Sequence, residues 1–490
     1  MRMEIDLLRL DRDVARAARA LRAALGDLTR RGPTPPAEDQ GGPSAAEARA
    51  RLENPLEPFR RVSARTTYLE LTGKTPGLGA ELGLASPTAA AAPDPTGLAA
   101  PLADWVYTLT LERVVWPDRV RLAAAWHAAS LTIDLPEPAR VSPREARLRL
   151  LADPTDAGRR TFAEVLARGS GAVADAARIL VERRHEAARR LAEEGLRAIE
   201  IPCDPPDAAI GAAEALLRRT EPMMERAPTW YGALGRAVGR DAASGWPARL
   251  SPRWIEELFR ATKLTEGLAI DLGPLPSPLG AASFARALAR FGAALARGVG
   301  QTTRGPFALA HAPFDLRRAR RAALFGGLVA DPVFCARALG LGRGRALDQA
   351  RATARSLLLS LRLDAATVAL VFRSGQDGGG HVLLRGARDR GDRFEEVTAR
   401  ALGAPIPGAL AGVLPALDPG AAARLAGAVL AARDRRDLIE RFDEDWFRNP
   451  RAAEALRDED GAPRSPASRR ASEADLEAGL GELVRALASL

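Results

Sequence analysis

Apolar residues recur along most of this chain at the three- and four-residue spacing of an amphipathic α-helix. Within residues 281–297, Phe284, Leu288, Phe291 and Leu295 fall on one helical face. Few stretches alternate apolar and polar residues with the two-residue period of a strand. Aromatic residues make up only 5 % of the chain, so alanine, leucine and valine must fill much of the core. The pattern predicts an all-α protein with a large multi-helix body.

Breaks in this pattern predict how the chain is organised. An amphipathic helix over residues 3–30 is followed by a Pro/Gly-rich linker, and a second such segment covers residues 86–97. We therefore divide the chain into an N-terminal part, residues 1–100, and a helical domain, residues 101–490, with a polar loop near 458–471 before a terminal helix. Further helices are predicted over residues 144–151, 161–166, 171–199, 208–220, 252–262, 348–372, 421–442 and 473–490.

The positive charge of the chain consists almost entirely of arginine. The formal net charge is +9, and Lys74 and Lys263 are the only lysines among the 71 basic residues. The arginines are spread along every predicted helix and interrupted by acidic residues, whereas a nucleic-acid-binding protein usually gathers its charge in one patch. The sequence therefore favours solvated helix faces over a nucleic-acid interface.

Other features of composition indicate a cytoplasmic protein. Two cysteines, Cys203 and Cys335, are too few for a disulfide framework. The first residues carry charges throughout and lack the apolar run of a signal peptide. No window approaches the ~20 apolar residues of a membrane span.

The histidines exclude one common zinc site. The chain has four, His127, His185, His311 and His381, and no two of them are four residues apart. No helix can therefore present the paired imidazoles of a His-Glu-x-x-His motif to one metal. His185-Glu186 comes nearest, but Arg189 stands where the second histidine is required, so this segment is expected to be a solvated helix face.

Several segments nevertheless resemble one family of zinc enzymes, the oligoendopeptidase F and thimet oligopeptidase class. The most specific is residues 440–457, which contain the run Trp-Phe-Arg-Asn-Pro at 446–450 after an acidic turn. Residues 394–407, 185–192 and 258–262 are similar to other helices of the family. The resemblance covers residues 105–490 in patches and implies a helical oligopeptidase-like scaffold with a central cleft.

The resemblance also implies where the zinc site would lie. Residues 284–296 match the family's zinc helix, which places its two histidine ligands at Ala289 and Ala293 and its catalytic glutamate at Arg290. The Leu-Phe and Ala-Asp-Pro runs at 324–332 place the third ligand, a glutamate, at Ala319. The family's tyrosine-bearing segment reads Asp-Pro-Gly-Ala-Ala-Ala-Arg-Leu here, at 418–425. An alanine-rich core helix with no such ancestry would also fit residues 284–296.

These degenerate positions imply a catalytically inactive metallopeptidase-like protein, a pseudoenzyme that holds no zinc or other cofactor. We expect it to bind a peptide or a protein partner in the residual cleft, where Arg290 would present a cation to a carboxylate. Two other interpretations stay open. The chain could be a hydrolase with a site assembled from distant residues, or an arginine-rich helical protein that binds other molecules or nucleic acid through its surface.

Overall fold

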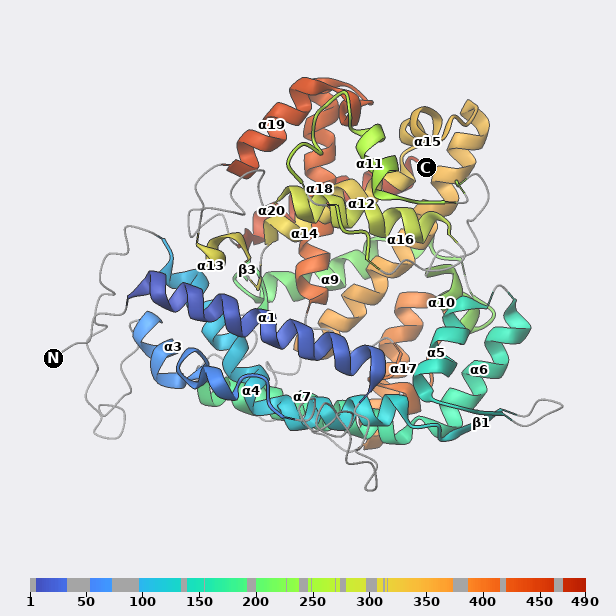
Figure 1. The fold of residues 1–490 in the computed structure, drawn as a ribbon. Coiled ribbons are helices and arrows are strands. Elements are labelled where there is room, and N and C mark those ends of the chain that lie inside the picture. The colour runs from blue at the N-terminus through green and yellow to red at the C-terminus, as the bar shows by residue number, and fades with distance from the viewer. Residues whose placement is uncertain are drawn as a thin grey trace.

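The computed structural model is built almost entirely of helices (Figure 1). It describes residues 6–32, 53–72, 97–133, 139–153, 155–191, 200–225, 227–237, 246–247, 249–268, 270–273, 279–296, 306–311, 313–314, 316–372, 387–414, 420–461 and 470–490. The all-α prediction is confirmed. His381, the Pro/Gly-rich segments after residues 32 and 72, and residues 462–469 of the predicted terminal loop lie outside the described residues.

The α-helices follow the apolar periodicity of the sequence. In chain order they are α1 (Leu7–Arg31), α3 (Arg65–Thr72), α4 (Ala99–His127), α5 (Pro143–Ala152), α6 (Asp156–Gly169), α7 (Gly171–Leu191), α9 (Asp207–Arg219), α10 (Trp230–Ala237), α11 (Pro252–Leu258), α12 (Ala281–Leu295), α13 (Phe307–Ala310), α14 (Leu316–Gly326), α15 (Pro332–Leu339), α16 (Arg343–Phe372), α17 (Ala387–Leu402), α18 (Ala421–Phe442), α19 (Pro450–Gly461) and α20 (Glu473–Ala488). Short 3-10 turns include η1 (Glu57–Ser63), η3 (Gly327–Ala330) and η7 (Trp446–Arg448).

Several predicted bounds need adjustment. Helix α18 has the predicted ends, and α20 begins where the pattern places it. The helix predicted over 252–262 stops at Leu258, and residues 192–199 at the end of the helix predicted from 171 lie outside the described residues. Residues 458–461 of the predicted loop belong to α19.

Two small sheets complete the described secondary structure. Strands β1 (Leu131–Ile133) and β2 (Ala139–Val141) pair antiparallel, while β3 (Cys203–Asp204) and β4 (Ala471–Ser472) pair in parallel. The second pair joins the chain before α9 to the start of α20. Within the described ranges no single helix has the length and hydropathy of a membrane span, although the bent pair α14–η3 and α15 passes that test jointly.

Three large groups of buried apolar side chains fill most of the interior of the described structure, and a small fourth group lies between α15 and the start of α16. One lies between α1, η1, α3, α4 and α13; a second surrounds α6, α9, α17 and the second half of α16; a third lies among α11, α12, α14, α15 and η7. Figure 1 shows α1 and α4 along one side of the molecule and α12, α14 and α18 crossing on the other. Helix α16 runs between these regions, and nearly every residue from 362 to 372 on it is buried.

A buried arginine fastens α16 to the ends of two other helices. The side chain of Arg362 is fully buried. Its guanidinium donates hydrogen bonds to Leu217 O (2.8 Å) in the last turn of α9 and to Ala401 O (3.0 Å) in the last turn of α17, and also to Thr220 and Arg400. Burial lowers the pKa of Arg362 to about 10. None of these four partners is a carboxylate. The positive charge of Arg362 is therefore stabilised by the partially negative carbonyl ends of two helices.

Helices α12, α14, α18 and α20 approach each other through glycine. Gly292 on α12 lies against the backbone of Arg321 on α14, and Gly427 on α18 lies against the backbone of Ala319, also on α14. A methyl group added at Gly479 on α20 would lie 2.5 Å from Val429 O on α18. Each of these crossings brings two backbones closer than any side chain would permit.

The contact at Gly479 yields a test of this packing. We expect Gly479→Ala to lower the free energy of unfolding by about 1–3 kcal/mol, because the added methyl group would push α20 from α18. Gly481 lies on the same helix with nothing within 4 Å of an added methyl group, so Gly481→Ala should raise stability by up to about 1 kcal/mol. Denaturant-induced unfolding of both variants measures the difference. Equal effects of the two substitutions would contradict the proposed close contact.

Candidate functional site

The four residues at the expected zinc-site positions lie on two neighbouring helices. Ala289, Arg290 and Ala293 belong to α12, and Ala319 belongs to α14. The two helices run antiparallel, because Gly292 lies against Arg321 while Ala289, earlier on α12, lies against Gly326, later on α14. The structure thus brings together the helices that carry these positions.

The side chains of Ala289 and Ala319 each contact a neighbouring helix. The Cβ of Ala289 is 3.1 Å from where a Cβ of Gly326 would lie, so it faces the end of α14. Ala319 lies against Gly427, so it faces α18 instead. Ala293 is 8 % exposed. These contacts give Ala289 and Ala319 different neighbours, and the assignment of the four residues to one degenerate site stays a prediction.

Arg290 lies at the edge of α12 against the loop that precedes it. Its guanidinium donates to Leu272 O and occupies the space where a Cβ of Gly273 would lie. Gly273 has φ +52°, so glycine suits the position in both conformation and space. Arg286 lies one turn earlier on α12, where partial burial and the charge of Arg290 lower its pKa. Among the described residues, no carboxylate forms an ion pair with either guanidinium.

Ion pairs occupy the side of α14 next to Ala319. The side chain of Arg321 is 1 % exposed and pairs with Glu459 of α19 (2.8 Å) and Asp434 of α18 (3.8 Å). Arg320 makes two hydrogen bonds to the same Asp434. The positive charges of Arg320 and Arg321 are therefore matched by carboxylates of the protein itself.

The remaining histidines and the cysteines do not form a metal site within the described part of the chain. His127 ends α4 near Thr29 O (3.3 Å), and the ring of His311 packs on Phe307 with centroids 4.7 Å apart. His185 is buried on α7, which corrects the expectation of a solvated face at that residue. No group of three His, Cys, Asp or Glu side chains among the described residues could hold a metal ion.

Neither thiol is suited to nucleophilic chemistry. Cys203 and Cys335 are both fully buried. Burial raises the pKa of each thiol to about 12, so at neutral pH both are protonated and shielded from reagents.

A buried ionic cluster that the sequence did not predict joins α4 to α7. Arg184 on α7 donates to Glu112 on α4 (2.7 Å) and to Glu200 (2.6 Å), and Arg119 makes two further bonds to Glu112 (2.6 and 2.7 Å). Tyr107 donates to the same oxygen of Glu200 (3.4 Å). The side chain of Glu200 is 0 % exposed and that of Glu112 is 6 % exposed.

The charges in this cluster are arranged for packing rather than for acid–base chemistry. Burial raises the pKa of Glu200, whereas the two guanidiniums lower that of Glu112 against the opposing effect of burial. Two carboxylates with opposite pKa shifts are a pattern found in hydrolase sites. Here, however, Arg184 lies between them and hydrogen-bonds to both, which leaves no room for a substrate group at that point.

Arg184 could not be identified from sequence as part of this cluster, because its partners are 16 and 72 residues away. Glu112 precedes Arg184 by 72 residues, and both lie in helices that carry many other charged groups. The local signal was the triplet Arg183-Arg184-His185, in which one arginine points into the protein and its neighbour stays 61 % exposed. Arg183 and Arg184 differ only in the side of α7 on which they lie, because the rotation of α7 turns Arg184 toward α4.

Replacing Glu112 tests the importance of this cluster. We expect Glu112→Gln to lower the free energy of unfolding by about 3–5 kcal/mol at neutral pH, because Arg184 and Arg119 would lose a buried counter-charge. The depressed pKa of Glu112 in the folded state means that its stabilisation is present at neutral pH and is lost as the pH falls through that pKa. The difference from wild type should therefore shrink in acid.

Glu57→Gln is the matched control, since Glu57 forms an exposed ion pair with Arg60 (2.7 Å). It should cost less than about 1 kcal/mol. Urea unfolding of both variants at several pH values makes the comparison, and a pH-independent loss in Glu112→Gln would argue against the ionic interpretation.

Comparison with known proteins adds no relative to this picture. No known family, curated protein or solved structure matches this chain. The resemblance to zinc oligopeptidases therefore stays a prediction from the segments quoted from the sequence.

Proposed function

We propose that this chain is a non-catalytic, metallopeptidase-like helical protein that binds a peptide or a protein partner. The observation that carries the proposal is the identity of the residues on the paired helices α12 and α14. Ala289, Ala293 and Ala319 offer no atom that can ligate zinc, and Arg290 carries a guanidinium that cannot act as a base at neutral pH.

The packing of the two helices supports the same conclusion. A catalytic zinc needs an open coordination position for water and substrate. The glycine contacts at Gly292 and Gly326 bring α12 and α14 together, and the alanine at 289 occupies the space beside Gly326. Small residues at the proposed ligand positions allow α12 and α14 to approach closely. The proposed loss of the zinc ligands is therefore compatible with the loss of the space that zinc and a substrate would need between the two helices.

Binding rather than chemistry is assigned to Arg290. Arg286 and Arg290 place two guanidiniums on consecutive turns of α12, and their like charges disfavour each other. A carboxylate from a peptide or partner would relieve this repulsion and could accept bidentate hydrogen bonds. The proposed ligand group is therefore a carboxylate, such as a peptide C-terminus or an acidic side chain.

Metal analysis and a cleavage assay test the catalytic half of the proposal. Protein purified without chelator should contain zinc far below one equivalent and should not cleave a quenched fluorescent peptide library. Stoichiometric zinc, or cleavage that a chelator abolishes, would show an active metallopeptidase. Cleavage that persists with chelator would instead favour a hydrolase with a different site.

A pair of peptides tests the binding half. A fluorescein-labelled alanine peptide with a free C-terminal carboxylate should bind about tenfold more tightly than its C-terminal amide, since one charge-assisted pair distinguishes them. Arg290→Ala should abolish that difference, while Arg253→Ala, an exposed arginine on α11, should preserve it. Fluorescence polarisation gives the affinities. Equal binding of the two peptides to wild type would refute a carboxylate site at Arg290.

A further inference from the structure

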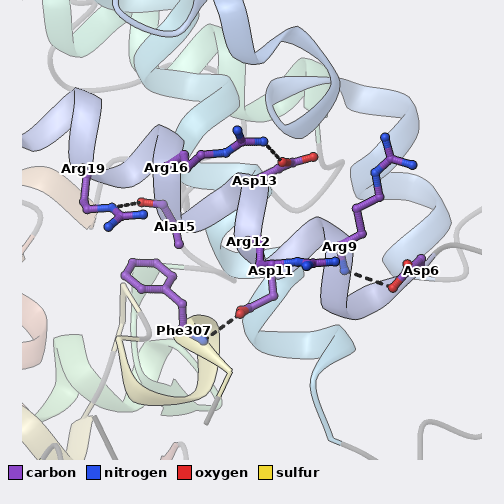
Figure 2. Close-up of a pocket in the computed structure, with 9 residues that line it drawn as sticks. All are labelled: Asp6, Arg9, Asp11, Arg12, Asp13, Ala15, Arg16, Arg19 and Phe307. Atoms are coloured by element: carbon purple, nitrogen blue, oxygen red, sulfur yellow. Dashed lines mark hydrogen bonds and ion pairs between the residues drawn. The ribbon is translucent and has the colours of Figure 1, made fainter. Parts of the chain in front are cut away.

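Four arginines line one face of the N-terminal helix α1. Arg9, Arg12, Arg16 and Arg19 are all exposed and, at 100° per residue, fall within about 80° of the helix circumference. They border a groove between α1 and the start of α13 (Figure 2). With a rise of about 1.5 Å per residue, the row is about 15 Å long.

The opposite wall of the groove is fixed by a buried carboxylate. Asp11 is 6 % exposed and accepts hydrogen bonds from the backbone N–H groups of Phe307 (2.7 Å) and Ala308 (2.7 Å). Phe307 packs between Trp105 and His311, with ring centroids 5.4 and 4.7 Å away. Two ring contacts and the hydrogen bond from its backbone N–H to Asp11, drawn in Figure 2, thus hold Phe307 beside the arginine row.

Most of the positive charge in the groove is not matched by the protein. Asp6 caps α1 by accepting from Arg9 N (3.0 Å), and Asp13 pairs with Arg16. Asp11 is already used by the backbone of α13. Within the described residues, no carboxylate forms an ion pair with the guanidinium of Arg9, Arg12 or Arg19.

An apolar side chain extends the same face. Leu8 precedes Arg12 by one turn and is 60 % exposed, the highest value among the exposed large apolar residues of the described chain. An acidic peptide segment with one apolar residue would complement this surface. Its carboxylates would pair with the arginines, and its apolar side chain would pack on Leu8 or Phe307. A nucleic-acid backbone fits less well, because it would supply anions for the arginines but no aliphatic group for the exposed Leu8.

We propose that the groove between α1 and α13 is a docking site for an acidic segment of a protein partner. Carboxylates of the segment pair with Arg9, Arg12 and Arg19, and an apolar side chain packs against Phe307. The site is separate from Arg290 and does not depend on the peptidase-like ancestry of the scaffold.

Fluorescence polarisation with a fluorescein-labelled glutamate peptide containing a central leucine tests the site. The full-length double variant Arg12→Ala/Arg19→Ala removes two open guanidiniums from the groove. Arg30→Ala/Arg31→Ala removes the same charge from exposed positions at the other end of α1 and serves as the matched control. Circular dichroism checks that both variants fold, and fluorescein-labelled oligothymidylate is measured in parallel.

We expect saturable peptide binding that weakens as salt increases and falls at least about tenfold in the groove variant, but no more than about twofold in the control. Repeating the series in an Arg290→Ala background removes the carboxylate site proposed on α12, and the loss caused by Arg12→Ala/Arg19→Ala should persist there, which separates groove binding from the proposed function. Absence of peptide binding, or equal losses in the two double variants, would overturn the proposal. Oligothymidylate binding as tight as peptide binding and equally sensitive to Arg12→Ala/Arg19→Ala would replace it with a nucleic-acid site.

Discussion

The packing of α12, α14, α18 and α20 depends on one constraint, direct contact between their backbones. At Gly292, Gly427 and Gly479 the neighbouring helix lies where a Cβ would otherwise be. Helices at this separation gain dispersion energy along their whole length but tolerate almost no added volume. The scarcity of aromatic residues in the sequence also favours closely spaced helices, because alanine packed on leucine fills only a narrow space between them. At these three glycines the paired helices are too close for a wide cavity to lie between them.

The helical content could be predicted from sequence because it depends on local periodicity. The apolar residues of α12 and α18 identify both helices, and the ends of α18 agree with the prediction. The two short sheets could not be predicted in this way. Strand β3 has only two residues and pairs with residues 471–472, so its formation depends on where α20 begins rather than on its own sequence.

The candidate site was harder to predict from sequence than the fold. The family resemblance predicted that Ala289 and Ala319 lie on two different helices. Which neighbour each alanine faces depends on the rotation of its helix, which periodicity alone does not determine. The arginines were harder still. Arg184, Arg321 and Arg362 are nearly or fully buried, yet in sequence they resemble the exposed arginines around them. Their partners are 16 to 145 residues away, so a count of charges cannot distinguish an arginine that supports the core from one that faces solvent.

The link between Asp11 and α13 has a consequence for the order in which the chain acquires its structure. The carboxylate lies in α1, but the two amides that it binds come almost three hundred residues later. Helix α1 can pack on α4 early, whereas Asp11 stays unmatched until Phe307 and Ala308 have been made. Any chain that ends before these residues would hold a buried carboxylate without its hydrogen-bond donors and would lack one wall of the groove. The groove beside α1 is therefore complete only after residue 308 has been made, although its four arginines lie between residues 9 and 19.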